Sequence, residues 1–254
     1  MKYHSKIKEG GWDDSHRQWP LPSLPWVMQQ TWNDLLFAHY PIKMDKLRSL
    51  VPEALTIDSF DGVGWIGIVP FQITKSRMKA VPPIPGISAF PELNVRTYVS
   101  VDGKPGVYFI SMDTTNLLAV SGARTLYHLP YVVADMNVSY KEDFVNYDSK
   151  RLDDSGALLN CSYRPISDPY YPQKGSFDEW MAERYCLYTV NGSEEVKRCD
   201  ILHEPWQLQI AEADFNLNTM LSHQSIFVEN NAPILHFSKR KKVRIWPLVN
   251  PYKE

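Results

Sequence analysis

The sequence predicts a strand-rich, mostly antiparallel fold of barrel-like shape, in one domain with only a few short helices. Aromatic residues make up 13% of the 254-residue chain, including 14 Tyr and 8 Trp, and such residues are enriched in strands. Turn signals at 102–106 and at Asn191-Gly192 each separate two runs of β-forming residues. No internal repeat or linker divides the chain, so we expect a single β-rich domain over residues 27–254.

Residues 1–26 are predicted to form an extended arm. Three tryptophans are spaced among three prolines there, namely Trp12, Trp19, Trp26, Pro20, Pro22 and Pro25. Prolines stiffen a chain and tryptophans bury a large area, so we expect the arm to pack these side chains on the body of the protein. A partly disordered leader is the alternative that the sequence leaves open.

The first elements of the domain are predicted from turn and helix signals. Asp45 is expected to cap a helix over 46–51, which a proline ends. An apolar run over 63–71 follows the turn signal Asp61-Gly62 and predicts a strand. The segment 81–91 contains four prolines and predicts a stiff loop. Two hairpins are then expected, with strands at 92–101, 107–113, 185–190 and 196–202.

Between the hairpins we expect two helices and two strands. A helix over 117–128 has a stripe that is predicted to lie against a sheet, formed by Ala119, Gly122, Ala123 and Leu126. Strands are predicted at 131–140 and 157–164, with a polar stretch between them. Ser176 begins a capping box that opens a helix reaching Arg184.

Charge and motifs exclude several classes of function. The formal net charge of −2 argues against a nucleic-acid or membrane partner, and the basic run over 239–244 is interpreted as the solvated edge of a strand or turn. Nothing resembles a secretion signal or a membrane span, and three unpaired-looking cysteines predict a reduced, cytoplasmic protein. Phosphate-binding, dinucleotide-binding, hydrolase-elbow and zinc-protease motifs are missing, so we expect no cofactor and no metal.

Alternation along 92–101 separates polar from apolar side chains. One face carries Leu93, Val95, Thr97, Val99 and Val101, and the other carries Glu92, Asn94, Arg96, Tyr98 and Ser100. The polar face either lines an interior, where it would present an acid, an amide, a guanidinium and a phenol, or it faces water. Periodicity alone leaves both possibilities open.

Two helices carry further candidates. Arg124 and His128 are four residues apart and project from one side of their helix, where they could present a cation and a proton-transfer group to a ligand. A structural role for both is the favoured alternative. Arg184 could stack on Trp180 one turn earlier, although we favour a helix that docks through Trp180 and leaves its charges in water.

These segments together resemble an uncharacterised, YqjF-like bacterial family within the acetoacetate-decarboxylase-like superfamily. The resemblance rests on seven segments, at 37–41, 47–52, 60–71, 94–99, 105–109, 175–185 and 203–206. It implies a cone-like antiparallel β-barrel with a mostly apolar interior. It also favours an interior position for the polar face that begins at Glu92.

The resemblance to the decarboxylases themselves is weaker and falls on their active site. Glu92 lies where they place an active-site glutamate, and Arg124 lies at the arginine of their Gly-Arg-Glu helix. Their next two functional positions are lysines. One of these lysines forms a Schiff base with a β-keto acid, and its cationic neighbour and burial lower the pKa of its amine. Here Tyr131 and Val132 stand at those positions, so we predict no Schiff-base decarboxylation.

The resemblance implies a small-molecule pocket for a carbonyl or carboxylate compound. Candidates to bind the ligand are Arg96, Tyr98, Arg124 and His128, and the candidate catalytic pair is Glu92 and Tyr131, acting as base and acid. A cofactor-free acid–base enzyme is the first hypothesis. A non-catalytic binder of small acids and a structural or interaction module are the alternatives. A homo-oligomer is left open.

Overall fold

The computed structural model describes residues 12–222, 226 and 232–253, with the backbone alone at 118–119 and 121–123. These residues form twelve strands and three short helices. In chain order the elements are β1 (Met28–Ile42), α1 (Met44–Arg48), β2 (Thr56–Ile57), β3 (Gly64–Met78), β4 (Phe90–Val101), β5 (Lys104–Thr114), α2 (Leu117–Tyr127), β6 (Tyr131–Lys141), β7 (Phe144–Arg151), β8 (Leu158–Pro165), α3 (Phe177–Ala182), β9 (Cys186–Val190), β10 (Val196–Leu202), β11 (Gln209–Asn218) and β12 (Ile234–Val249).

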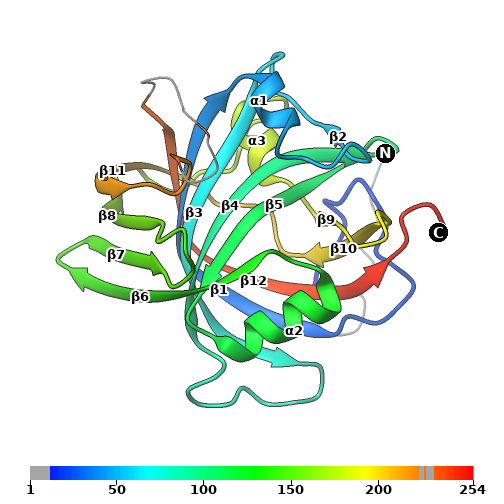
Figure 1. The fold of residues 1–254 in the computed structure, drawn as a ribbon, viewed down its shortest axis with the longest axis horizontal. Coiled ribbons are helices and arrows are strands. Elements are labelled where there is room, and N and C mark those ends of the chain that lie inside the picture. The colour runs from blue at the N-terminus through cyan, green and yellow to red at the C-terminus, as the bar shows by residue number, and fades with distance from the viewer. Residues whose placement is uncertain (1–11, 223–225, 227–231, 254) are drawn as a thin grey trace.

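Strand pairing closes a ring. β12 pairs with β1, β1 with β3, β3 with β4, and β4 with β5. From β5 the ring continues through β9 and β10 and returns to β12. A second path from β5 to β12 runs through β6, β7, β8 and β11, which form a wing on the left of Figure 1. Among the strand pairings of the described residues, only β5–β6 and β5–β9 are parallel, so the predicted strand-rich, mostly antiparallel, barrel-like fold is confirmed.

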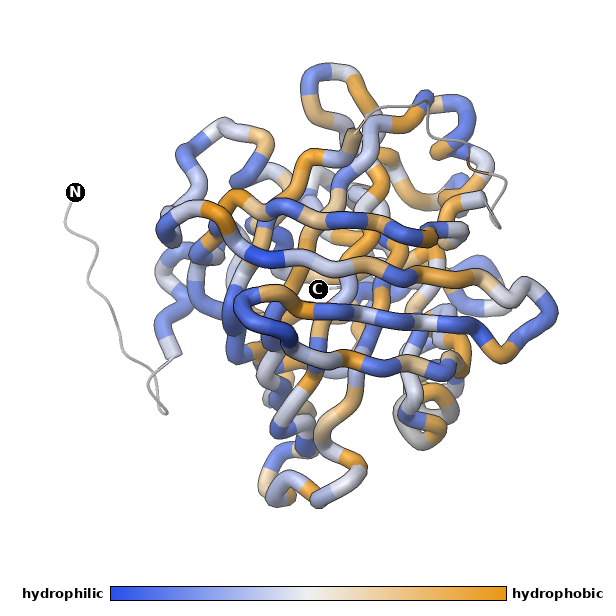
Figure 2. The backbone as a smooth tube through the Cα atoms, turned by 90° about the vertical axis from the view of Figure 1, so that its left-hand side faces the viewer, coloured by the Kyte–Doolittle hydropathy of each residue, from blue (hydrophilic) through white to orange (hydrophobic). Residues whose placement is uncertain are grey.

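The middle of β4, one of the strands shared by the two paths, is buried on both faces. On β4, Leu93, Val95 and Val99 belong to one hydrophobic cluster, whereas Phe90 and Tyr98 belong to another. The two sets alternate along the strand, so the clusters lie on its opposite faces. In the wing, buried residues alternate with more exposed ones along β7 and β8, and Figure 2 shows polar and apolar residues interleaved on the strands nearest the viewer.

The alternation of side chains between the two faces of β1 is shifted by one residue at Asp34. Trp32 packs against the same cluster as Leu35, although regular alternation would place these two side chains on opposite faces. Asp34 adopts a left-handed conformation with φ of 52°, which Asp tolerates better than most residues. Its carbonyl accepts a hydrogen bond from the Tyr163 hydroxyl at 2.8 Å, and its carboxylate lies 2.6 Å from the Lys239 ammonium. Contacts with β8 and β12 therefore hold this shift in place.

The helices differ from prediction in detail. Asp45 lies in the first turn of α1, and Lys43 occupies the N-cap without a side-chain hydrogen bond, so the predicted Asp45 cap is wrong. Ser176 does cap α3, because its hydroxyl accepts from the Glu179 amide at 3.2 Å. On α2 the side chains of the predicted stripe lie outside the described residues except for Leu126, which is 69% exposed and does not pack on a sheet.

Both predicted hairpins form. One strand is longer than predicted, and several strands were not predicted. The first hairpin turns tightly at Asp102-Gly103, with φ of 49° and 77°, so β5 begins at Lys104 rather than at 107. The polar stretch between 140 and 157 contains β7, which the sequence did not predict. β1 and β11 also went unpredicted, and the basic run over 239–244 lies within β12.

The arm is described from Trp12 onward, and residues 1–11 of the predicted arm lie outside the described part. Trp246 donates its indole N–H to the Leu24 carbonyl at 2.8 Å. Arg17 reaches Asp200 on β10, which also binds the Lys104 ammonium at 2.7 Å. No helix among the described residues is long and apolar enough to cross a membrane.

Candidate functional site

Glu92 and Tyr131 form a buried pair. The Tyr131 hydroxyl donates a hydrogen bond of 2.8 Å to Glu92 Oε2. Burial raises the pKa of Glu92 to about 7, although the hydrogen bonds from Tyr131 and Asn94 oppose the shift. Burial, together with the Glu92 charge, raises the pKa of Tyr131 well above its ordinary value. The carboxyl group therefore has both protonation states available near neutral pH, while the phenol stays protonated.

The backbone brings the pair together through β5. Glu92 lies opposite Thr114 on the β4 side of β5, and Tyr131 lies opposite Met112 on the β6 side. α2 connects β5 to the parallel strand β6, so the start of β6 returns to the end of β5. Arg124 on α2 donates from Nε to the Tyr131 carbonyl at 2.6 Å, which ties the helix to the same point.

A second polar group continues along the same face of β4. The Tyr98 hydroxyl and His39 Nε2 lie 2.5 Å apart, and both side chains are fully buried. Burial lowers the pKa of His39 well below its ordinary value, and the Arg96 charge acts in the same direction. His39 is therefore neutral. Gly67 leaves room for this ring, because a Cβ there would lie 3.1 Å from His39 Nε2.

Arg96 lies between aromatic rings. Its guanidinium carbon is 5.4 Å from the centre of the Phe37 ring and 5.8 Å from that of Tyr98. No carboxylate within the described part of the chain forms an ion pair with Arg96, and its buried Nε has no hydrogen-bond partner there. Nearby buried atoms that also have no partner among the described residues are His39 Nδ1, Trp65 Nε1, Asn94 Oδ1 and Trp180 Nε1. Donors prevail in this group.

Arg184 departs from the interpretation favoured by the sequence. It is only 6% exposed, its guanidinium lies over the Trp180 ring at 4.7 Å, and it forms an ion pair with Asp58 at 2.5 Å. The favoured reading, in which the helix keeps its charges in water, is wrong at this residue. The partner could not be foreseen because Asp58 is 126 residues away in sequence.

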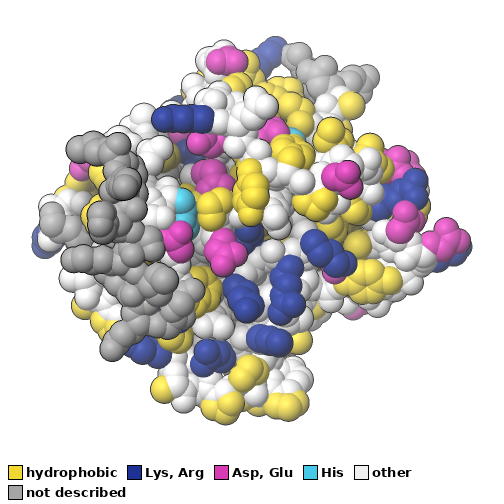
Figure 3. Space-filling view, turned by 180° about the vertical axis from the view of Figure 1, so that it is seen from behind, with side chains coloured by type: hydrophobic (Ala, Val, Ile, Leu, Met, Phe, Trp, Pro, Cys, Tyr) yellow, Lys and Arg dark blue, Asp and Glu magenta, His cyan; other side chains and the backbone are white. Residues whose placement is uncertain are grey.

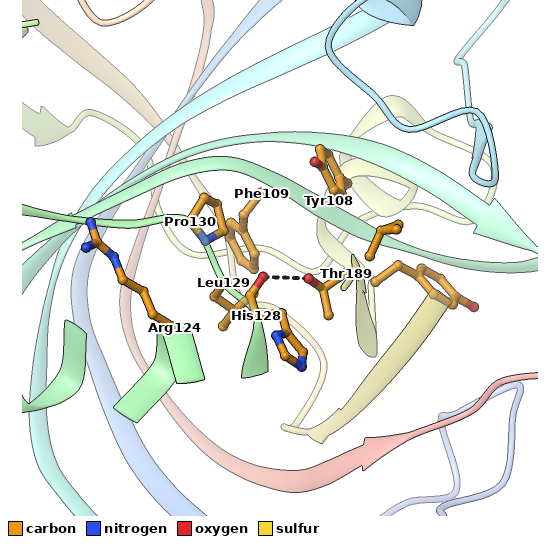
Figure 4. Close-up of a pocket in the computed structure, with 9 residues that line it drawn as sticks. Tyr108, Phe109, Arg124, His128, Leu129, Pro130 and Thr189 are labelled. Atoms are coloured by element: carbon orange, nitrogen blue, oxygen red, sulfur yellow. Dashed lines mark hydrogen bonds between the residues drawn. The ribbon is translucent and has the colours of Figure 1, made fainter. Parts of the chain in front are cut away.

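Arg124 and His128 line a surface pocket of about 260 Å³. The other lining residues are Tyr108, Phe109, Leu129, Pro130, Tyr188, Thr189 and Val190. Figure 4 shows the Arg124 guanidinium pointing away from the His128 ring, so the two do not form one cation and acid pair. The His128 backbone carbonyl accepts a hydrogen bond from the Thr189 hydroxyl at 2.7 Å.

The six predicted site residues therefore form three separate pairs rather than one cluster. Glu92 meets Tyr131, Arg96 contacts Tyr98, and Arg124 and His128 line the pocket, which none of the other four residues lines. Arg124 links the pocket to the pair through the Tyr131 carbonyl.

Sequence reasoning gave His39 no role, although it lies in one of the segments that carry the family resemblance. Plain alternation places His39 on the face of Phe37, and the two rings stack, but this signal went unused because β1 was not predicted. Within the described residues, no group of three or more His, Cys, Asp or Glu side chains is arranged to hold a metal ion.

Comparisons with known proteins agree with this architecture. The chain is 47% identical over 228 residues to the uncharacterized protein YqjF of Bacillus subtilis (strain 168), covering 90% of this chain and 94% of that one. Acetoacetate decarboxylase from Legionella pneumophila superposes with a TM-score of 0.58 at 14% identity, covering 91% of this chain and 92% of that one. The enduracididine biosynthesis enzyme MppR complexed with pyruvate gives 0.60 at 9% identity, covering 89% and 90%.

The two solved structures share the fold with this chain. Because their sequence identities are 9% and 14%, they show the fold alone and not the function. The family is shown by sequence. Residues 29–242 match DUF2071, a family described as an uncharacterized conserved protein, and the match to YqjF extends over nearly the whole of both chains. The chain thus belongs to the DUF2071 family, is a relative of YqjF, and has the fold of the acetoacetate-decarboxylase-like proteins.

Proposed function

We propose that this protein acts on a small carbonyl or carboxylate compound by acid–base chemistry, without an imine and without a cofactor. The observation that carries the proposal is the buried Glu92 carboxyl group, whose pKa is raised to about 7 and which holds the Tyr131 hydroxyl at 2.8 Å. A group that titrates near the working pH is the most effective donor and acceptor of protons. Glu92 is the base that takes the proton next to the carbonyl, and Tyr131 is its acid partner, which donates a hydrogen bond to the oxygen of the developing enolate.

Arg96 is the proposed anchor for the substrate carboxylate. It lies on the same face of β4 as Glu92, two alternations further along the strand, and carries no carboxylate partner within the described residues. A guanidinium that is partly withdrawn from water binds a carboxylate through two hydrogen bonds. The fold relative MppR has been captured with pyruvate, a 2-keto acid, which supports this class of ligand.

Tyr131 also excludes the chemistry of the decarboxylases from the proposal. By family resemblance, Tyr131 and Val132 stand at the positions of their lysine pair, and neither a phenol nor a valine side chain can form an imine with a ketone. The pocket lined by Arg124 and His128 is the proposed route of access, because Arg124 contacts the Tyr131 carbonyl from that side.

Non-catalytic binding of small acids is the second candidate. One observation favours it: Glu92 is 3% exposed and Tyr131 is 8% exposed, so the pair is closed to a substrate unless neighbouring side chains move. In this case Arg96 and Arg124 would still attract a carboxylate, and no proton would be exchanged with it.

Proton exchange in D₂O separates the two candidates. Pyruvate and a panel of 2-keto and 3-keto acids are incubated with the protein, and loss of the C–H signal next to the carbonyl is followed by NMR. We expect catalysed exchange that increases with pH around a midpoint near 7, as Glu92 ionises. Glu92→Gln should lower the rate by roughly 100-fold or more, and Arg96→Met should mainly raise KM.

Glu212→Gln is the matched control, because Glu212 is a partly exposed carboxylate on β11, paired with Arg164. Thermal stabilisation by the same acids without exchange would support the binder instead. Exchange that persists in Glu92→Gln would overturn the assignment of the base.

A reduced, cytoplasmic location accompanies the proposal. Cys161, Cys186 and Cys199 are all free and buried. Burial raises the pKa of Cys161 to about 12 and that of Cys186 to about 11, so these thiols are unreactive core residues. Such residues need no oxidising compartment.

A further inference from the structure

The loop between β3 and β4 presents apolar side chains to solvent. Val81, Ile84 and Ile87 are 42%, 48% and 41% exposed, and three prolines lie among them. This loop extends from the bottom of the molecule in Figure 1. Exposed apolar side chains are common singly, but a group of them on one projecting loop indicates a contact surface.

Hydrogen bonds hold the loop in one shape. Ser88 accepts from the Ile84 amide through its hydroxyl at 2.8 Å, and its own amide donates to the Ile84 carbonyl at 2.9 Å. Asn116 donates to the Ile87 carbonyl at 2.9 Å, which ties the loop to the start of α2. The apolar side chains are therefore held outward by a folded turn rather than by a lack of structure.

A basic face adjoins the loop. Arg77 and Arg244 both lie opposite Gln29 of β1, on its two sides, so their side chains share one face of the sheet. Arg240 and Lys242 precede Arg244 at two-residue intervals on β12 and are exposed. Figure 3 shows Lys and Arg side chains gathered in the lower half of the view, above hydrophobic side chains at its bottom edge.

Trp26 joins the basic face to the root of the loop. The Arg77 and Arg244 guanidinium carbons and the Lys79 ammonium lie within 6.0 Å of the Trp26 ring. The sequence contains no Asp or Glu in residues 26–33, 72–91 or 239–249, which supply these strands and the loop. The net charge of −2 for the whole chain conceals this local excess of positive charge.

We propose that the loop over 81–87 and the basic face formed by Arg77, Lys79, Arg240, Lys242 and Arg244 bind an anionic lipid bilayer. The apolar tip enters the boundary between headgroups and acyl chains, and the basic side chains contact the anionic headgroups. A projecting convex tip needs a soft partner rather than a matching rigid groove. Symmetric pairing of two copies through this face would place their basic residues against one another, which argues for the bilayer.

Vesicle sedimentation tests the proposal. The full-length protein is mixed with vesicles of phosphatidylglycerol and phosphatidylcholine in a 1:3 ratio, and with vesicles of phosphatidylcholine alone. We expect binding to the first and not to the second, with loss of binding as salt is raised. Ile84→Asp, and separately the double variant Arg240→Glu/Lys242→Glu, should each lower the bound fraction by roughly tenfold or more.

Matched controls lie elsewhere on the surface. Ile166→Asp changes an isoleucine that is 53% exposed after β8, and Lys141→Glu/Lys150→Glu reverses two exposed lysines of the wing. Both should bind as the parent protein does. Absence of binding to anionic vesicles, or equal binding by Ile84→Asp, would overturn the proposal. So would a dimer in analytical ultracentrifugation that Ile84→Asp converts to a monomer without vesicle binding, since the face would then join two copies.

Discussion

Two buried carboxyl groups in this protein have opposite surroundings. Asp200 on β10 is surrounded by three cations, with Lys104 Nζ and Arg198 Nε at 2.7 Å and Arg17 Nη2 at 3.2 Å. Glu92 on β4 has a phenol and no cation partner within the described residues. The first arrangement pairs the carboxylate with three cations and joins the arm to two strands. The second leaves the protonation state free to change, as acid–base chemistry requires.

The largest expected effect is the loss of the Asp200 carboxylate. Asp200→Ala leaves three buried cations without this partner, which should lower the free energy of unfolding by about 3–5 kcal/mol. Urea unfolding monitored by tryptophan fluorescence measures the loss. Glu92→Ala is the comparison, and if both variants lost equal stability the contrast between the two sites would be wrong.

The second effect is the pH dependence that Glu92 imposes on stability. Its pKa rises from 4.5 in the unfolded chain to about 7 in the folded one, so the folded protein binds more protons between these values and becomes less stable as pH rises. Relative to Glu92→Gln, the parent should lose on the order of 3 kcal/mol between pH 4.5 and pH 8.

Unfolding of both proteins at several pH values in this range gives the difference directly. A constant difference across the range would show that the Glu92 carboxyl group has an ordinary pKa in the folded protein. It would also remove the main support for Glu92 as a base.

A smaller effect is expected at Gly67, which packs against the buried His39 ring. Gly67→Ala places a Cβ 3.1 Å from His39 Nε2, so the ring must shift slightly, at a cost of about 1 kcal/mol. Gly192→Ala is the matched control, because nothing lies within 4 Å of the Cβ position there. Melting temperatures should fall for the first variant alone; equal melting temperatures would indicate that His39 has room to move.

The smallest expected effect is no effect at all. Borohydride trapping with acetoacetate should leave the mass of the protein unchanged, because the family resemblance predicts Tyr131 and Val132 in place of the lysine pair and the Lys104 ammonium is bound by Asp200. A mass increase of one reduced adduct, found by intact-protein mass spectrometry, would contradict both statements and would locate an amine that the structure does not suggest.

Local signals explain which parts of the fold were predictable. The hairpin at Asp102-Gly103 and the cap at Ser176 depend on neighbouring residues, so sequence reasoning found both. β7 was missed because its alternation is polar on the open side of the wing. The pairing of Lys104 with Asp200 joins residues 96 apart, and no local pattern encodes it.

The candidate site was predictable only through resemblance. Alternation could not decide whether the face beginning at Glu92 is buried, and the structure shows that Glu92, Asn94 and Tyr98 are all under 9% exposed. Family resemblance placed Tyr131 at a functional position, but its hydrogen bond to Glu92 depends on the parallel pairing of β5 with β6. Packing of that kind is visible only in three dimensions.

The shift of alternation at Asp34 makes the length of β1 critical for which side chains face the interior. Removing this one residue would restore plain alternation, and every side chain on the arm side of it would exchange faces relative to His39. Trp32 and Thr31 would exchange faces, so the large indole would have to fit where the small Thr31 side chain is now buried, at 1% exposure. A homologue that lacks a residue here must therefore carry the inverse polar and apolar pattern over 28–33, so the length of β1 and its hydrophobic pattern must evolve together.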